Sequence, residues 1–508
     1  MSASTLTSLF SPASLAVIAA CTLYGTFIGA MPGLTATMAV ALLVPFTYFM
    51  DPLIAISAIV ATTTTAIFAG DVPGTLMRIP GTPASAAYVE DAYRLSRAGR
   101  SRSTLMVSLF AACIGGLVGV ALLALIAPQL ARVAVQFSSF ETFWLACLGL
   151  SCAVLTSNGS VAKSFSSLFL GLFIATIGID VAVGHPRFTF GNYELFDGIS
   201  FIPAIIGLFA LSEILRSAQI GHRDQPANAV QESFSKALRE AALVLRRFKR
   251  NIARSSVLGT LIGALPGAGA DIAAWICYAI SRRFSRHPER YGTGYIEGVT
   301  DGGSANNAAI GGAWTPALVF GIPGDSVTAI AIGILLLNGM SPGPQIFTES
   351  PELVHTLYGA FALSNLAMIP AGLLVIMASS QVVRIPRRVL MPCVLLFSLV
   401  GAYAITNSVI AIWTVLALGV LGYAMEANGF PLAPAILGIV LGTIVEENFM
   451  TSMMKAQGDL LAFFDRPWAA ALGTLTLLLW ALLLTRGIYE SVQRRRHPSP
   501  SAETETYP

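Results

Sequence analysis

Residues 259–271 read Gly-Thr-Leu-Ile-Gly-Ala-Leu-Pro-Gly-Ala-Gly-Ala-Asp, and residues 25–37 read Gly-Thr-Phe-Ile-Gly-Ala-Met-Pro-Gly-Leu-Thr-Ala-Thr. The two stretches are copies of one pattern, 234 residues apart (259 − 25) in a chain of 508 residues. A second pattern is also repeated: residues 73–81 and residues 316–324 both end in Ile-Pro-Gly, at an offset of 243 (323 − 80). Because both patterns recur in the same order, the sequence predicts two related halves.

The composition is that of an integral membrane protein. Hydrophobic residues make up 55% of the chain and charged residues only 11%, whereas charged residues make up about 25% of soluble domains. The net charge of +3 provides no basic field for nucleic acid. The six cysteines lie in apolar segments and the five histidines are scattered, so we expect neither disulfides nor a transition-metal site.

Proline and glycine interrupt the apolar runs at matched places. Pro32-Gly33 divides residues 13–50, an uncharged run longer than the roughly 20 residues of one crossing. Pro266-Gly267 divides residues 255–281 in the same way. We expect each segment to be a re-entrant hairpin or broken helix, with its non-helical tip inside protein or a water-filled cavity. Matched breaks indicate a transport site; the alternative is that they are kinks and packing glycines.

The basic residues predict the orientation in the membrane. The first 77 residues contain no Lys or Arg, which places the N-terminus outside the cytoplasm and provides no basic region of a signal peptide. Four arginines between residues 94 and 102 predict a cytoplasmic loop. Segment 255–281 is basic at both ends, so it should enter the membrane from the cytoplasm and return to it. The corresponding segment at 13–50 should instead open to the outside. The halves are then inverted, as in alternating-access transporters.

The predicted fold is therefore an all-α polytopic membrane protein with two inverted-topology repeats, of the elevator-like secondary-transporter type. We expect membrane repeats at 1–215 and 255–486, joined by a cytoplasmic amphipathic linker at 216–254 and followed by a disordered cytoplasmic tail at 487–508. Apolar residues recur in the linker at steps of three and four amid basic residues, which is typical of a helix on the inner leaflet; binding a calmodulin-like partner is the alternative. Run lengths predict about ten full spans plus the two hairpins.

Enzyme motifs are weak. No Gly-Lys dipeptide occurs, so a Walker A loop is absent from the sequence. Residues 339–343 fit Gly-x-Ser-x-Gly, with His355 nearby. That motif requires a strand, a sharp turn and a helix, and the proline after Ser341 favours a simple loop. We therefore expect a protein that is not an enzyme.

Polar groups near the breaks are candidates for binding. A broken helix exposes backbone N–H groups that suit a carboxylate and carbonyl groups that suit sodium. Ser304, Asn306 and Asn307 add neutral donors and acceptors, although Asn306-Asn307 could instead cap the following helix. Charged groups at membrane depth usually have a function. The four here are Asp71, Arg78, Asp271 and Asp325, and Asp71 and Arg78 could instead neutralise each other.

These stretches make the chain similar to the large membrane subunit of the bacterial tripartite tricarboxylate transporters. The similarity includes residues 25–33, 79–85, 259–269, 294–324, 430–434 and 446–448. It implies ion-driven secondary uptake across the bacterial cytoplasmic (inner) membrane, with a small membrane subunit and a periplasmic solute-binding protein that delivers a carboxylate. Two departures concern the substrate: Ala69-Gly70-Asp71 replaces an expected Gly-Gly-Ser, and Arg78 replaces an Asn before Ile-Pro-Gly.

We expect both hairpins and both Ile-Pro-Gly loops to enclose one site near the middle of the bilayer. The residues expected to bind the substrate carboxylate are Arg78, Pro80, Gly81, Thr82, Ser304, Asn306, Asn307, Pro323, Gly324, Asp325 and Ser326. Those expected to bind the coupling ion, sodium or alternatively a proton, are Gly33, Thr35, Gly267, Gly269 and Asp271. No cofactor is expected. The alternative function is a carboxylate channel or passive pore.

Overall fold

The computed structural model describes residues 9–32, 34–156, 160–180, 184–219, 232–266, 269–382 and 387–496. The helices up to the linker are α2 (Pro12–Gly29), α3 (Ala36–Thr47), α4 (Pro52–Ala69), α5 (Asp71–Met77), η1 (Ser85–Ala87), α6 (Val89–Leu95), η2 (Ser96–Arg100), α7 (Ser101–Ala134), α8 (Ser139–Thr156), α9 (Val161–Ala175), η3 (Tyr193–Leu195), α10 (Phe201–Ile205), η4 (Ile206–Leu211) and α11 (Ser212–Gln219). Strands β1 (Gly178–Ile179) and β2 (Pro186–Arg187) form a small antiparallel pair.

The helices of the linker and the second half are α12 (Phe234–Arg247), α13 (Lys249–Gly263), α14 (Gly269–Phe284), η5 (Pro288–Arg290), α15 (Ile296–Phe320), α16 (Ser326–Leu337), α17 (Ile346–Glu349), α18 (Pro351–Val382), α19 (Arg387–Thr406), α20 (Val409–Ala427), α21 (Leu432–Lys455), η6 (Leu461–Phe464) and α22 (Pro467–Arg496). The described chain is thus almost entirely helical, which confirms the predicted all-α class.

Seven helical segments in the described part of the chain are long and apolar enough to cross a membrane: Pro12–Gly29, Pro52–Met77, Val89–Ala134, Pro351–Ser379, Val409–Ala427, Leu432–Lys455 and Pro467–Gly487. Four more apolar helices have only 10–17 residues. The predicted count of about ten spans is higher because some apolar runs are divided into helices shorter than a crossing requires. The apolar run at 308–337 is one of these: α15 begins earlier, at Ile296, and a break at 321–325 separates it from α16.

The first hairpin breaks where the sequence predicts. Helix α2 follows Ser11, whose side chain accepts a hydrogen bond from the Ser14 N–H at 3.2 Å. It ends at Gly29, and α3 begins at Ala36. In the second hairpin, α13 ends at Gly263 and α14 begins six residues later. The breaks coincide with the two Pro-Gly positions because proline cannot continue the hydrogen-bond pattern of a helix.

Both hairpins pack on a long helix through glycines that allow backbone contact. A Cβ atom on Gly29 would lie 2.4 Å from the Ala66 carbonyl oxygen in α4, and one on Gly263 would lie 2.4 Å from the Ala309 carbonyl oxygen in α15. Ala66 and Ala309 are 243 residues apart (309 − 66), the offset of the Ile-Pro-Gly repeat. The same residue types therefore make the same contact in each half.

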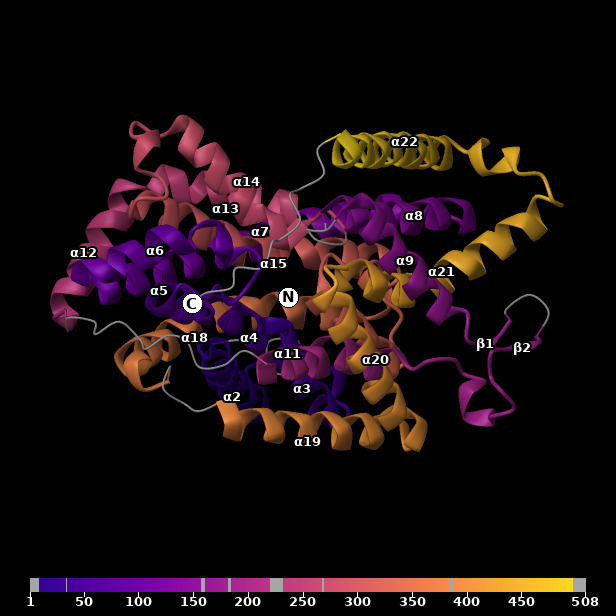
Figure 1. Cartoon of the computed structure of the whole chain (residues 1–508), viewed down its shortest axis with the longest axis horizontal. Helices are drawn as coiled ribbons and strands as arrows, with labels where there is room; N and C mark the ends of the chain where they lie inside the picture. Colours follow the sequence, from indigo (N-terminus) through magenta and orange to yellow (C-terminus); the bar gives the residue numbers. More distant parts are fainter. Residues whose placement is uncertain are drawn as a thin grey trace, which may run out of the picture.

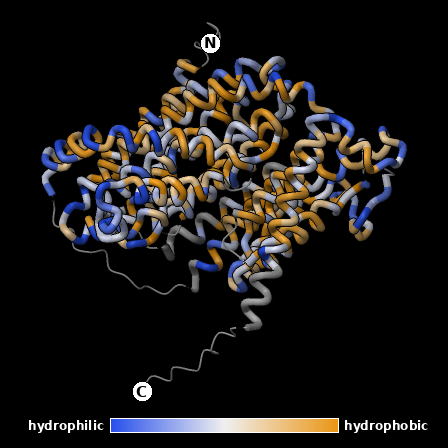
Figure 2. Tube along the Cα trace, turned by 90° about the horizontal axis from the view of Figure 1, so that it is seen from above, coloured by the Kyte–Doolittle hydropathy of each residue, from blue (hydrophilic) through white to orange (hydrophobic). Residues whose placement is uncertain are grey.

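The helices form two neighbouring groups (Figure 1). One contains the hairpin arms together with α4, α7, α15 and α18. The other contains α8, α9, α21 and α22, where aromatic rings around Trp144 and Phe463 pack together. Hydrophilic residues gather most densely at the two opposite ends of the molecule, with hydrophobic helices between them (Figure 2). This distribution fits helices that cross a bilayer and loops that lie outside it.

Candidate functional site

The starts of α3 and α16 meet, although they are far apart in the sequence. The Thr37 and Ser326 hydroxyl oxygens are 3.0 Å apart, a hydrogen bond across 289 positions. Thr35 caps α3, its Oγ1 accepting from the Met38 N–H at 3.2 Å. Two helix N-termini, each with unpaired N–H groups and the positive end of a helix dipole, thus lie side by side, an arrangement that favours an anion.

Carboxylates border the same place. Asp325 caps α16, accepting from the Thr328 N–H at 2.7 Å and the Thr328 hydroxyl at 2.6 Å. Asp271, in the first turn of α14, lies close enough to Asp325 for their charges to interact. The Asp325 side chain is buried, and Asp271 is half-buried. In the part of the chain that the structure describes, neither carboxylate forms a salt bridge, so the neighbouring pair suits a bound cation.

The contact between halves is reciprocal. The Trp275 indole N–H in α14 donates to the Pro83 carbonyl oxygen at 3.0 Å, just after the first Ile-Pro-Gly. Each hairpin's second arm therefore contacts the segment after Ile-Pro-Gly of the other half. We name the group formed by Thr35, Thr37, Asp271, Asp325 and Ser326 the tip cluster.

Both Ile-Pro-Gly loops lie against their own long helices. A Cβ on Gly81 would lie 2.3 Å from the Gly70 Cα, and one on Gly324 would lie 2.5 Å from the Ala313 Cα. The partners Gly70 and Ala313 again differ by 243. No larger side chain fits at Gly81 or Gly324 without moving the loop, so these glycines set how closely each loop approaches its helix.

Asp71 lies in a second buried network. It accepts a hydrogen bond from the Tyr88 hydroxyl at 2.8 Å and another from the Ser108 hydroxyl. The Asn306 amide in turn donates to the Tyr88 oxygen at 3.3 Å. A cavity of about 10 Å³ adjoins Asp71, Tyr88 and Ser108, about the size of one water molecule. The network joins a carboxylate of the first half to an amide of the second.

Asn307 contacts the residue that corresponds to it in the other half. Its amide nitrogen donates to the Thr64 carbonyl oxygen at 3.1 Å, and 307 − 64 is again 243. Among the described residues, the Asn307 Oδ1 and the Thr64 Oγ1 have no hydrogen-bond partner, although both side chains are buried. The alternative that Asn306-Asn307 caps a helix is wrong, because both residues lie in the interior of α15.

The alternative that Asp71 and Arg78 neutralise each other is also wrong. Arg78 is the C-cap of α5, with a left-handed φ of 61°. This geometry turns its side chain, which is 61% exposed, to Glu90, and the Arg78 Nε is 2.7 Å from the Glu90 Oε2. A salt bridge this exposed contributes little to stability.

The remaining predicted residues are placed as follows. Thr82 and Ser85 bond each other, the Ser85 N–H donating to the Thr82 Oγ1 at 3.0 Å. The Ser304 hydroxyl donates to the Asp301 carbonyl oxygen at 3.1 Å. Gly269 lies in a tight turn, where a Cβ would be 2.2 Å from the Ile262 carbonyl oxygen. Pro80 and Pro323 lie in the two Ile-Pro-Gly loops, whereas Gly33 and Gly267 lie outside the described residues.

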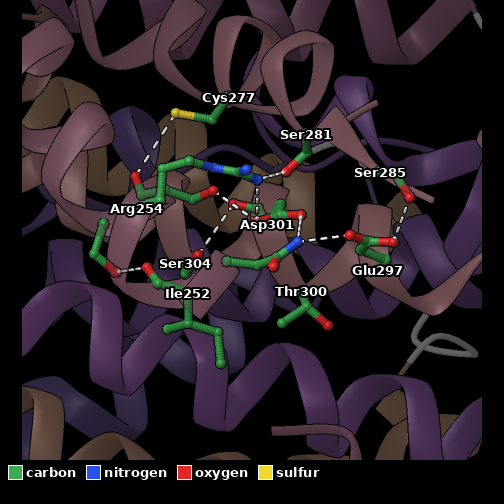
Figure 3. Close-up of polar contacts among 12 residues, drawn as sticks. Ile252, Arg254, Cys277, Ser281, Ser285, Glu297, Thr300, Asp301 and Ser304 are labelled. Carbon is green, nitrogen blue, oxygen red and sulfur yellow. Dashed lines mark hydrogen bonds and ion pairs between the residues drawn. The ribbon is translucent and has the colours of Figure 1, made fainter. Parts of the chain in front are cut away.

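A polar network fixes the second hairpin to α15 (Figure 3). Asp301, fully buried, accepts from the Ser255 hydroxyl at 2.7 Å and lies 3.6 Å from the Arg254 guanidinium. Glu297 accepts from the Asn251 amide at 2.6 Å and from the Ser285 hydroxyl at 2.7 Å. Because these bonds link both hairpin arms to one helix, they hold the hairpin in place relative to the predicted amides of α15.

Sequence reasoning did not single out Thr37, Thr64, Tyr88 or Ser108 as functional. Thr64 belongs to a run of four threonines, Thr62 to Thr65, in an otherwise apolar helix, and such a run is a usable signal. Thr37 is the last residue of the first repeated stretch. Tyr88 and Ser108 have no sequence signal, because they are recognised only through their contact with Asp71.

Comparison with known proteins decides the family. The family described as the tripartite tricarboxylate transporter TctA family matches residues 15–437. The chain belongs to this family. It is 32% identical, over 450 residues, to a protein of Agrobacterium vitis named as an uncharacterized 52.8 kDa protein in the TAR-I ttuC' 3'region, a match that covers 89% of each chain.

A second relative from Agrobacterium vitis, named as an uncharacterized protein in the TAR-II ttuC' 3'region, is 35% identical over 195 residues, 38% of this chain and 81% of the relative. No solved structure matches the chain. Membership confirms the resemblance and points to a large subunit of a tripartite transport system with other subunits, not to an enzyme. Ser341, from the weak hydrolase motif, lies in a loop between helices.

Proposed function

We propose that this TctA-family chain is the translocation subunit of a binding-protein-dependent, ion-gradient-driven secondary transporter for tricarboxylates or related carboxylates. It would work in the bacterial inner membrane with a small membrane subunit and a periplasmic solute-binding protein. The observation that carries the proposal is the Thr37–Ser326 hydrogen bond, because it unites the broken segments of both halves at two helix N-termini.

The tip cluster offers groups of two kinds. The N–H groups at the starts of α3 and α16, with the Thr37 and Ser326 hydroxyls, suit a substrate carboxylate. Asp271 and Asp325 suit a cation instead. The Asp325 carboxylate, which also caps α16, would repel a negatively charged substrate and attract a cation. We therefore assign Asp325 to the ion, whereas the sequence alone placed it with the substrate. Sodium is the proposed coupling ion and a proton the alternative.

The loops around Pro80-Gly81-Thr82 and Pro323-Gly324 are proposed to line the substrate path, and Asn306 and Asn307 to supply amides to it. The free Asn307 Oδ1 supports this role, because an unpartnered buried oxygen costs stability unless a ligand uses it. For Arg78, which is exposed and paired with Glu90, the proposed role is to attract the anion rather than to hold it.

We further propose that the halves are inverted repeats related by a twofold axis close to Asn307 and Thr64. A residue that contacts its own counterpart must lie near such an axis, and Asn307 does so at the offset of 243. The reciprocal contacts of the hairpin arms with the opposite loops agree with this arrangement. Alternating access would then move the hairpin group against the group that contains α8, α9, α21 and α22.

Uptake of labelled citrate and dicarboxylates tests the proposal. Vesicles would contain the chain with its two proposed partner subunits, with and without a sodium gradient. Thr37→Val should raise the KM for uptake about tenfold, because a hydrogen bond to a charged ligand is worth about 1.5–3 kcal/mol. The matched control is Thr47→Val in the same helix, where the hydroxyl bonds only the Val44 carbonyl oxygen.

Uptake that requires the gradient and the binding protein would support a coupled transporter. Downhill flux that ignores both would refute it and favour a channel. If Thr37→Val and Thr47→Val show equal uptake kinetics and uptake still requires the gradient, the protein is a coupled transporter but its substrate does not bind at the tip cluster.

A further inference from the structure

A polar cavity lies apart from the proposed transport site. Its volume is about 370 Å³, and three segments enclose it: the end of α12, the residues before α7 and the loop before α15. Ligand pockets usually enclose about 300–1,000 Å³, so a small anion or a lipid head group fits. The cavity adjoins the arginine-rich loop at 94–102, which the distribution of basic residues places in the cytoplasm.

The cavity has an excess of positive charge. Arg100, Arg247 and Arg290 line it, one from each segment, whereas Glu240 is its only acidic lining residue. Glu240 is already used: it pairs with Arg100 and accepts from the Ser103 hydroxyl at 2.7 Å. In the part of the chain that the structure describes, no salt bridge engages Arg247 or Arg290. Two guanidinium groups are therefore available to a ligand.

The loop that forms one wall is held rigidly. The Asp91 carboxylate in α6 accepts from the backbone N–H groups of Gly292 at 3.1 Å, Gly294 at 2.8 Å and Tyr295 at 2.9 Å. It also accepts from the Tyr278 hydroxyl at 2.7 Å. Because a buried carboxylate binds three backbone N–H groups within residues 292–295, the wall does not need to be ordered when a ligand binds.

Arg247 is also restrained. Its guanidinium carbon lies 5.3 Å from the centre of the Phe248 ring, within the range of a cation–π contact. Phe248 is buried beneath it. A planar guanidinium held against a ring keeps its edge N–H groups free, and such an edge fits two oxygens of a phosphate group.

We propose that this cavity binds a phosphate group through Arg247 and Arg290, on the cytoplasmic face and independently of the transported substrate. The phosphate could belong to an anionic phospholipid or be free in solution. Basic pockets beside cytoplasmic helix ends bind anionic lipid head groups, and Leu243, which is 61% exposed on the same helix, would contact the acyl region. A bound phosphate would tie α12, which joins the halves, to the loop before α15.

The test uses the purified full chain in a neutral detergent. Its thermal unfolding would be followed by tryptophan fluorescence during titration with inorganic phosphate, with phosphatidylglycerol and with phosphatidylcholine. The double variant R247Q/R290Q removes both free guanidinium groups. The matched control R283Q removes an exposed arginine of α14 that does not line the cavity.

We expect phosphatidylglycerol, inorganic phosphate or both to stabilise the wild-type chain and R283Q, and the double variant to bind at least about tenfold more weakly. Stabilisation by the lipid alone identifies a head-group site, and stabilisation by inorganic phosphate identifies a site for free phosphate. Equal responses of the wild type and the double variant, or equal responses to phosphatidylglycerol and phosphatidylcholine without any response to phosphate, would overturn the proposal. If the double variant fails to fold, R247Q alone provides the same comparison.

Discussion

Replacement of Asn307 by alanine should separate stability from transport. The Asn307 amide donates to the Thr64 carbonyl oxygen at 3.1 Å and, more weakly, to the Met368 sulfur at 3.8 Å. Its Oδ1 is buried without a partner among the described residues. A buried unpartnered oxygen costs stability, and what distinguishes Asn307 is that its amide bonds its counterpart in the other repeated segment.

The magnitude follows from these contacts. Losing the hydrogen bond costs about 0.5–1.5 kcal/mol, and the emptied space costs about 1 kcal/mol more. Removing the unpartnered oxygen removes its desolvation penalty and so stabilises the folded state by about 1–3 kcal/mol. These effects nearly cancel, so the melting temperature of Asn307→Ala should change by at most about 4 °C. Uptake, by contrast, should weaken about tenfold or more if the amide contacts the charged substrate or the ion.

Thermal unfolding and gradient-driven uptake would be measured on the same preparation. Asn365→Ala is the matched control: Asn365 is equally buried, its Oδ1 is also unpartnered in the described structure, and its amide bonds only the Phe361 carbonyl oxygen of its own helix. Unchanged uptake and ion dependence in Asn307→Ala would refute the reasoning. So would an equal loss of uptake in Asn365→Ala, because the effect would then not depend on Asn307.

Three further predictions concern other contacts. In Gly263→Val, the new Cβ would lie 2.4 Å from the Ala309 carbonyl oxygen. This clash should separate the second hairpin from α15 and lower the melting temperature by several degrees. An unchanged melting temperature would contradict the packing of Gly263 on α15. Ser326→Ala should raise the KM of uptake several-fold with little change in unfolding; a larger change in unfolding than in KM would make the hydroxyl structural. Burial alone raises the pKa of Glu240, but the hydrogen bond from Ser103 and the charge of Arg100 outweigh burial and hold that pKa below its usual value. With its pKa lowered in the folded state, ionised Glu240 contributes stability above its unfolded pKa of about 4.5, and this stability is lost as the pH falls through the folded pKa. The difference in melting temperature between wild type and Glu240→Gln should therefore be largest near neutral pH and shrink towards pH 4. A difference that does not vary with pH would contradict this prediction.

The hairpin breaks were predictable because their causes are local. A proline next to a glycine disfavours the continuation of a helix, and a matched pair of Pro-Gly breaks is visible as a repeated pattern in the sequence. The helix boundaries around α15, in contrast, were not predictable. The run of glycine, serine and asparagine at 302–307 resembles a capped loop, yet it lies inside a helix because small residues let α7 and α13 approach its backbone. A Cβ on Gly115 of α7, for example, would lie 2.1 Å from the Ser304 carbonyl oxygen.

The predicted site was similarly divided. Sequence reasoning placed the tips, the amides and the Ile-Pro-Gly loops in one site. In the structure, Ser326 lies in the tip cluster, Asn306 in the network around Asp71, and Asn307 against Thr64. Among the described residues, no hydrogen bond links the two groups. The partners Thr37, Tyr88 and Ser108 could not be chosen in advance, because a hydroxyl in an apolar helix more often bonds its own backbone, as Thr63 does to the Ile59 carbonyl oxygen at 2.7 Å.

The sequence by itself determined the membrane class, the repeated stretches, the places where helices break and the family resemblance. Each depends on composition, on the conformational limits of proline and glycine, or on repetition, all of which are properties of neighbouring residues. The tertiary structure alone decided that Thr37 meets Ser326, that Asn307 meets Thr64, and that Arg78 turns away from Asp71 to Glu90. These contacts join residues far apart in the sequence or depend on a single backbone angle, so they follow from how the helices pack and not from any local pattern.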